Sequence, residues 1–207
     1  MLASALRRDI AFGTLAPDQK LKIEQLRQRY GASNHSMRET LRLLSAEGLV
    51  EATAQRGFRV TSATEEDLRD VMLVRTEIDK SALALAIQHG DIAWEGRVIA
   101  AHHALGKAEA ELLSNADDLT ALQWDEACRD FSRTLLEGCG SPRFLDMHTR
   151  LFDQSRRFRL ALLREGLLDF AARKNRQQQL LEAVLARDAK RACQLLDEDI
   201  RAELTAH

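Results

Sequence analysis

The sequence predicts a mainly α-helical protein, with an N-terminal winged helix-turn-helix followed by an all-α antiparallel helical bundle. The first observation is a series of helix, tight turn, helix and basic hairpin between Leu21 and Val60. The second is that the chain from Thr64 onward has long apolar repeats, few β-branched clusters and a single proline. The third is charge: residues 1–62 hold ten Lys or Arg against six Asp or Glu, a net +4, which leaves −6 for the remainder at the overall −2.

Two helices are predicted before the tight turn. The first carries apolar residues at helical spacing, namely Leu2, Leu6 and Ile10. Arginines lie inside this pattern instead of before an apolar core, so it indicates a helix and not a signal peptide. The second helix has its own apolar stripe, formed by Ile23, Leu26 and Tyr30. Gly31 ends it, because glycine accepts the left-handed conformation that closes a helix.

The helix after the turn must begin between Ser33 and Ser36. Ser33 can cap it, and Ser36 with Glu39 also fits the reciprocal capping-box pattern, so both serines stay open as the cap. One side of this helix is apolar and is predicted to pack, through Met37, Leu41, Leu44 and Gly48. The other side carries Asn34, Arg38, Arg42 and Ser45. Arginine can pair with guanine and asparagine with adenine, so this side suits the major groove.

The segment after this helix favours a DNA-binding role for the helix over that of an ordinary solvated amphipathic helix. Leu49–Ala52 and Phe58–Thr61 are predicted strands around a turn at 53–57, with Arg56 near its tip. A basic hairpin after a helix-turn-helix can contact phosphate or the minor groove. The predicted DNA-binding residues are Ser33, Asn34, His35, Ser36, Arg38, Arg42, Arg56 and Gly57.

The segment resembles the GntR family of bacterial transcription regulators. The resemblance is carried by 13–17 (GTLAP), Leu21, Leu26, 30–33 (YGAS), 37–41 (MRETL), Leu44, 47–50 (EGLV) and 56–60 (RGFRV). It implies that Arg38 reads bases and that Gly57 lets the wing approach the groove. The family usually has another arginine where this chain has Asn34, and often Thr-Pro where it has His35-Ser36. We therefore expect the binding mode to be kept and the operator sequence to differ.

Six helices are expected in the remainder of the chain. They run near Glu65–His89, Ile92–Ser114, Asp117–Glu137, Ser141–Arg164, Leu167–Arg187 and Ala189–Leu204. The predicted domains are a DNA-binding domain at 1–62 and an effector-binding and dimerisation domain at 63–207.

The order of these helices resembles the FCD domain of the FadR branch of GntR regulators, in its six-helix, VanR-like version. The residues that carry it are Asp67-Leu68, Val74-Arg75, 84–87, Phe131, Leu135, 138–141, 181–188 and Ala192. The resemblance implies a domain that dimerises and binds a small acidic effector, in many relatives beside a divalent metal held by one aspartate and three histidines. At the matching positions this chain has Cys128, Ser132, Gln177 and Asp199. Serine and glutamine are weak metal ligands, so we expect neither a metal ion nor another cofactor.

The remaining histidines do not supply another metal site. His102 and His103 are adjacent and face different sides of a helix, while His148 has no ligand-type residue three or four positions away. Without a metal, an anionic effector would need cations from the protein. The candidate cations are Arg75, Arg150, Arg157 and Arg159, although arginines in such clusters also commonly face water. The predicted effector pocket is Arg75, Cys128, Ser132, Arg150, Arg157, Gln177 and Asp199.

The sequence therefore predicts a homodimeric, DNA-binding transcription regulator that senses a small metabolite, expected to be an organic acid. The alternative is a constitutive repressor or architectural protein whose helical domain only dimerises or binds a partner. An enzyme is not expected, because no nucleophile, base and orienting acid stand at an interpretable spacing. No apolar run suits a membrane span, and three cysteines without CxxC spacing suggest neither disulfides nor zinc. We expect a cytoplasmic protein.

Overall fold

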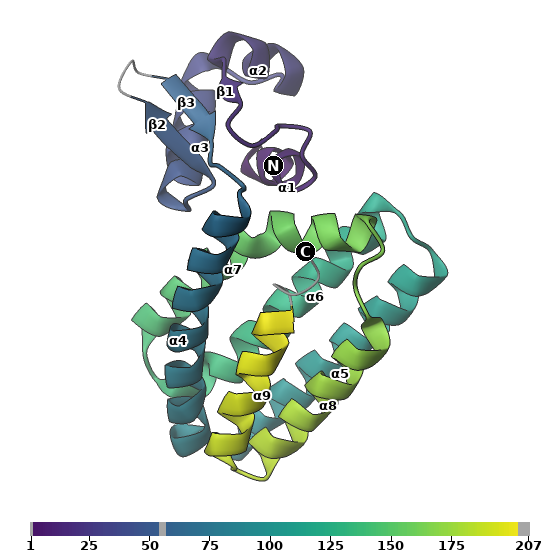
Figure 1. Cartoon of the computed structure of the whole chain (residues 1–207). Helices are drawn as coiled ribbons and strands as arrows, with labels where there is room; N and C mark the ends of the chain where they lie inside the picture. Colours follow the sequence, from purple (N-terminus) through teal and green to yellow (C-terminus); the bar gives the residue numbers. More distant parts are fainter. Residues whose placement is uncertain (1, 54–56, 203–207) are drawn as a thin grey trace. The chain divides into compact units, whose positions relative to one another are not determined.

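A computed structural model of the chain describes residues 2–53 and 57–202 (Figure 1). The chain divides into two compact units. One contains the residues up to Leu68 together with Asp153–Ala161, and the other contains Arg69–Phe152 and the chain from Leu162 onward. The first unit thus includes residues 153–161, which lie far along the chain, so these units are not the two continuous domains predicted from the sequence. The predicted domain boundary between residues 62 and 63 stays a prediction.

The first unit contains a helix-turn-helix and a three-stranded sheet. Its elements are α1 (Leu2–Ala11), β1 (Lys20–Leu21), α2 (Ile23–Tyr30), α3 (Asn34–Ala46), β2 (Val50–Thr53) and β3 (Gly57–Val60). The predicted apolar stripes form its core, since Leu6, Leu26, Met37 and Leu41 are all buried. Gly31 ends α2 at φ +64°, as predicted.

The sheet differs from the prediction by one strand. Its order is β1-β3-β2, with both pairs antiparallel. The hairpin is confirmed, although β2 and β3 are displaced by one residue from the predicted ranges, in register Val50 with Val60. The sequence did not predict β1, because two residues are too short to show a periodic pattern. Leu21 is nevertheless buried beside Phe58 in this strand.

Polar contacts fix the helices of the first unit to one another. Asp9 of α1 is buried and accepts hydrogen bonds from Tyr30 Oη at 2.5 Å and Arg29 Nη2 at 2.9 Å. Burial and the neighbouring Asp9 raise the pKa of the Tyr30 hydroxyl well above its ordinary value. Arg7 of α1 makes a bidentate ion pair with Glu47 at the end of α3, with distances of 2.8 and 2.5 Å. The orientation of α3 is thus set by more than apolar packing.

The segment Asp153–Ala161 adds two contacts to the first unit. Arg157 donates to the carbonyl oxygens of Thr61, at 2.7 Å, and Ser62. Gln154 donates to the carbonyl oxygen of Glu47 at 3.3 Å. Burial lowers the pKa of the Arg157 guanidinium, while Asp67 and Asp18 act in the opposite direction. The chain just after β3 is therefore held by a side chain almost a hundred residues away in sequence.

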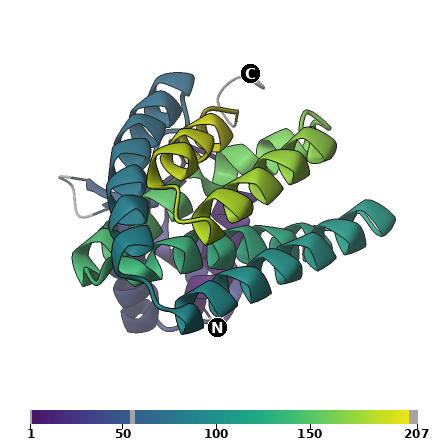
Figure 2. The same cartoon turned by 90° about the horizontal axis from the view of Figure 1, so that it is seen from below.

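Helices make up the remaining elements of the described chain. They are α4 (Glu65–His89), α5 (Ile92–Ser114), α6 (Asp118–Leu136), the 3-10 turn η1 (Glu137–Cys139), α7 (Pro142–Arg164), α8 (Phe170–Leu185) and α9 (Ala189–Ala202). In the second unit α5 packs against α6 and α8, and α8 packs against α9 (Figures 1 and 2). No described helix is both long and apolar enough to cross a membrane.

The predicted bounds agree with the structure for α4 and α5 and differ elsewhere at helix ends. The helix α8 begins at Phe170 and not at Leu167, because Asp169 caps it by accepting from the Ala172 N–H at 2.9 Å. It ends at Leu185, and Arg187 adopts a left-handed conformation at φ +58°. The Arg187 side chain donates to the carbonyl oxygens of Ile87 and Gly90, both at 2.7 Å. For α9, the predicted residues 203–204 lie outside the described chain.

A buried polar group links α4 to α7 in the second unit. Asp79 accepts from Arg75 Nε at 3.2 Å and contacts His148 Nδ1 at 2.8 Å. All three side chains are buried, and the Arg75 guanidinium lies 4.7 Å from the centre of the Phe152 ring. His148 is therefore a packed histidine with a carboxylate partner.

Candidate functional site

The outer face of α3 forms the candidate DNA-binding surface. Met37, Leu41 and Leu44 are fully buried on one face of the helix, so the opposite face is exposed. The exposed residues of this outer face include Ser33, Asn34, His35, Ser36, Arg38 and Arg42. The structure thus brings six of the eight predicted DNA-binding residues onto one helix and its cap.

The N-terminus of α3 resolves the choice between the two serines. Ser33 is the cap, and its hydroxyl oxygen accepts from the Ser36 N–H at 3.1 Å. The Ser33 hydroxyl also donates to the Ser36 hydroxyl at 3.0 Å. The helix N-terminus is thus exposed, with Asn34 as its first residue, and such an end favours a phosphate group.

The two arginines of α3 differ in their surroundings. Arg42 forms an ion pair with Glu39 one turn earlier. Arg38 is exposed and makes no hydrogen bond or ion pair with any described residue. A free guanidinium loses no internal contact when it binds a base, so Arg38 is better placed than Arg42 for direct readout.

The wing contributes one described residue to this surface. Gly57 begins β3 opposite Thr53, and a Cβ atom at position 57 would lie 3.0 Å from the Thr53 hydroxyl oxygen. A larger residue there would push on the paired strand, so glycine suits the hairpin itself as well as a close approach to DNA. Arg56 lies outside the described residues.

The positions that match the family's metal ligands differ in burial. Cys128 on α6 and Gln177 on α8 are buried, whereas Ser132 and Asp199 are half-buried. Asp199 of α9 accepts from Arg176 Nε at 3.1 Å, and Cys128 Sγ accepts from Arg173 Nη2 at 3.4 Å.

This donor set does not fit a metal ion. One carboxylate is occupied by an arginine, the thiol faces a guanidinium, and the other two groups are a hydroxyl and an amide. Among residues 2–53 and 57–202, no group of three or more His, Cys, Asp or Glu could hold a metal. Two of the four positions, Cys128 and Asp199, instead contact an arginine of the protein.

The four arginines predicted for effector binding lie in different surroundings. Arg75 is buried in its pair with Asp79, and Arg150 is exposed. Arg157 binds the chain after β3, and Arg159 is buried and donates to the Ser155 hydroxyl at 3.2 Å. Arg75, Arg157 and Arg159 thus contact three different polar groups of the chain.

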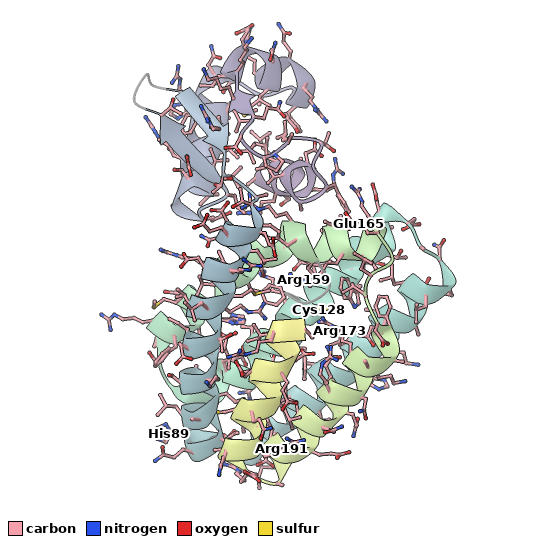
Figure 3. All side chains as sticks on the ribbon, viewed as in Figure 1. His89, Cys128, Arg159, Glu165, Arg173 and Arg191 are labelled. Atoms are coloured by element: carbon pink, nitrogen blue, oxygen red, sulfur yellow. The ribbon has the colours of Figure 1, made fainter. Side chains whose placement is uncertain are left out.

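Sequence reasoning missed Arg173. This residue is buried on α8, and its guanidinium reaches Cys128 on α6 and lies 3.9 Å from Glu109 on α5 (Figure 3). The guanidinium also lies 5.4 Å from the centre of the Trp124 ring. A signal for it exists, because Arg173 precedes Gln177 by four residues and so shares its helix face.

The groove between α5 and α6 is not part of this arrangement. It has a volume of about 570 Å³ and is lined by Ala100, Ala101, Ala104, Leu122, Gln123, Glu126, Ala127 and Asp130. It includes none of the predicted pocket residues, and its two carboxylates do not suit an anion.

Comparisons with known proteins match both parts of the chain to families of bacterial transcription regulators. Residues 1–60 match the family of bacterial regulatory proteins, gntR family, and residues 70–202 match the FCD domain. The chain is 36% identical to the HTH-type transcriptional repressor GlaR of Escherichia coli K12, over 94% of this chain and 89% of GlaR. It is 35% identical to the uncharacterized HTH-type transcriptional regulator BphR of Paraburkholderia xenovorans LB400, over 97% of this chain and 81% of BphR.

Solved structures share the fold. E. coli McbR/YncC superposes with a TM-score of 0.75 at 18% identity, over 97% of this chain and 92% of that chain. A GntR regulator from Rhodococcus sp. RHA1, described as putative, superposes with a TM-score of 0.75 at 20% identity, over 99% of this chain and 95% of that chain. At these identities the likeness supports the fold alone.

Proposed function

The chain belongs to the GntR family of bacterial regulatory proteins and carries an FCD domain, and we propose that it is a homodimeric repressor released from its operator by an organic acid. It is a transcription regulator with a DNA-binding helix-turn-helix and not an enzyme. The repressor role is supported by the likeness to GlaR, and the site of action would be the cytoplasm, where bacterial DNA lies.

The observation that carries the proposal is the exposed polar face of α3. Its apolar side is buried, its N-terminus is capped by Ser33, and Arg38 stands free on its outer side. Two such helices in a dimer, about 34 Å apart, would read the two halves of a palindrome.

The link between sheet and bundle is a candidate route for the effector signal. Thr64 and Asp67 cap α4 through three hydrogen bonds of 2.7 to 3.1 Å. The hydrogen bonds from Thr64 lower the pKa of the Asp67 carboxyl. We propose that effector binding changes the separation of the two DNA-binding units through residues 61–67, so that both can no longer engage one operator.

The role of Arg38 is tested by replacing it with alanine. We expect binding to a palindromic duplex, selected from a random library by the wild-type protein, to weaken about tenfold, because a bidentate contact to guanine is lost. Binding to an unrelated duplex should change far less. Fluorescence anisotropy across a salt series measures both affinities.

The control for this substitution is Arg27→Ala. Arg27 belongs to α2 and pairs with Glu24 on the surface at 2.8 Å, so its loss removes an equal charge from the same unit. If Arg38→Ala and Arg27→Ala weaken the selected duplex equally, base reading by Arg38 is wrong. Failure of the wild-type protein to select any duplex would contradict the proposed function itself.

A further inference from the structure

We propose that the guanidinium of Arg173 takes the place of a metal ion as the cation that binds a carboxylate group of the effector. The inference rests on the proposed function, because it concerns the acid that would act on the regulator. It deepens that function by assigning the group that recognises the acid and the class of acid that fits.

The position of Arg173 is the first argument. Cys128 stands where the resemblance places an aspartate ligand, and Arg173 donates to its sulfur at 3.4 Å. Gln177, where a histidine ligand would stand, is buried one turn further along the same helix. Arg173 therefore contacts Cys128 (Figure 3) and shares a helix face with Gln177, four residues further along α8.

The surroundings of the guanidinium are the second argument. Glu109 and Trp124 are both buried beside it. Within the described chain, neither Glu109 Oε1 nor Trp124 Nε1 makes a hydrogen bond of ordinary geometry, although both atoms are inaccessible to water and the Trp124 N–H lies near enough to the Glu109 carboxyl group to lower its pKa. Buried polar atoms without partners are costly, so two of them beside one arginine indicate a place that a polar ligand completes.

The surroundings of Glu109 shift its carboxyl group toward the neutral form. Burial raises the pKa of its carboxyl group, while the Arg173 charge, the Trp124 N–H and Lys174 act to lower it and the Asp199 charge acts to raise it further. The indole N–H of Trp124 and the guanidinium of Arg173 would give two kinds of donor to one carboxylate.

The chemistry of the site points to a carboxylate and not to a larger anion. A planar guanidinium pairs with the two oxygens of a carboxylate in a bidentate manner. The Trp124 ring covers one side of the arginine, and Phe170 meets that ring edge-on at 5.8 Å. The apolar walls would accept the carbon chain or ring of an organic acid, whereas inorganic phosphate offers nothing to them.

The test compares four acids and phosphate on the wild-type dimer and three variants. Acetate, succinate, citrate and benzoate are screened by thermal unfolding, and the strongest binder is followed by calorimetry. We expect the wild type to be stabilised by at least one acid and by neither phosphate nor Zn²⁺, Ni²⁺ or Mn²⁺ alone. Arg173→Gln should lower the affinity for that acid at least about tenfold, because the substitution removes the charge-assisted contacts.

Two further variants keep the result interpretable. Glu109→Gln removes the carboxylate that could repel an acid and should bind the acid at least as tightly as the wild type. Arg191→Gln removes an exposed arginine of α9 and should leave the affinity unchanged (Figure 3). If Arg173→Gln alone fails to fold, the double variant Arg173→Gln with Glu109→Gln removes both members of the buried pair, and loss of acid binding relative to Glu109→Gln alone gives the same answer.

Three outcomes would overturn the inference. Arg173→Gln could bind the acid as tightly as the wild type, a metal ion alone could stabilise the wild type, or none of the four acids could stabilise it. The last result would favour a bundle that only dimerises or binds a partner. In each case operator selection by the wild type would still stand, so failure of this inference is distinct from failure of the proposed function.

Discussion

Replacing Asp79 with asparagine is expected to lower the free energy of unfolding by about 3–5 kcal/mol, because it removes a buried carboxylate that pairs with a buried guanidinium. Asp79 is fully buried and lies between Arg75, at 3.2 Å, and His148, at 2.8 Å. Asparagine keeps the shape of the side chain but cannot neutralise Arg75. The loss corresponds to a fall in melting temperature of roughly 10 °C for a chain of this size.

The matched control for this change is Glu77→Gln on the same helix. Glu77 pairs with Lys80 at 3.5 Å, but its side chain is 70% exposed. We therefore expect Glu77→Gln to lower the free energy of unfolding by less than about 1 kcal/mol. Adding Arg75→Met to Asp79→Asn should recover part of the stability, since the buried charge is then gone. Chemical denaturation measures all three variants. Equal unfolding midpoints for Asp79→Asn and Glu77→Gln would show that the buried pair contributes no more than a surface pair.

Local sequence patterns predict those elements whose formation depends on residues close together in the chain. Apolar stripes predict α1 to α3. The cap at Thr64 predicts where α4 begins, and Gly90 predicts the break between α4 and α5. The strand β1 and the end of α8 escape this reasoning. Lys20–Leu21 becomes a strand because β3 lies beside it, and the turn at Arg187 is stabilised by carbonyl groups of residues 87 and 90. Those partners are distant in sequence, so no local pattern contains them.

The candidate sites differ in the same physical way. The DNA-binding face follows from one helix, so its exposed residues could be predicted from spacing alone. The proposed effector site would be built from three helices, and Arg173 was not among the four arginines that the sequence suggested. Arg75 is paired with Asp79, and Arg173 adjoins Cys128 and Glu109. Only the packing of α5, α6 and α8 distinguishes them.

Gly138→Ala is expected to lower the free energy of unfolding by about 2–3 kcal/mol, because two stretches of backbone approach too closely for a side chain. A Cβ atom at position 138 would lie 2.9 Å from the Ala86 carbonyl oxygen and 3.2 Å from the Cα atoms of Ala86 and Gly90. These are backbone atoms at the end of α4, which cannot rotate away as a side-chain tip can. Relief would need η1 to move from α4.

Gly106→Ala is the control, and its expected effect has the opposite sign. Gly106 lies within α5, where a Cβ atom would meet nothing within 4 Å. Alanine should therefore raise the free energy of unfolding by about 0.5–1 kcal/mol through its higher helix propensity. Urea denaturation of the two variants measures both changes. If Gly138→Ala were as stable as Gly106→Ala, the contact between η1 and α4 would be loose enough to admit a methyl group, and steric exclusion could not explain the glycine.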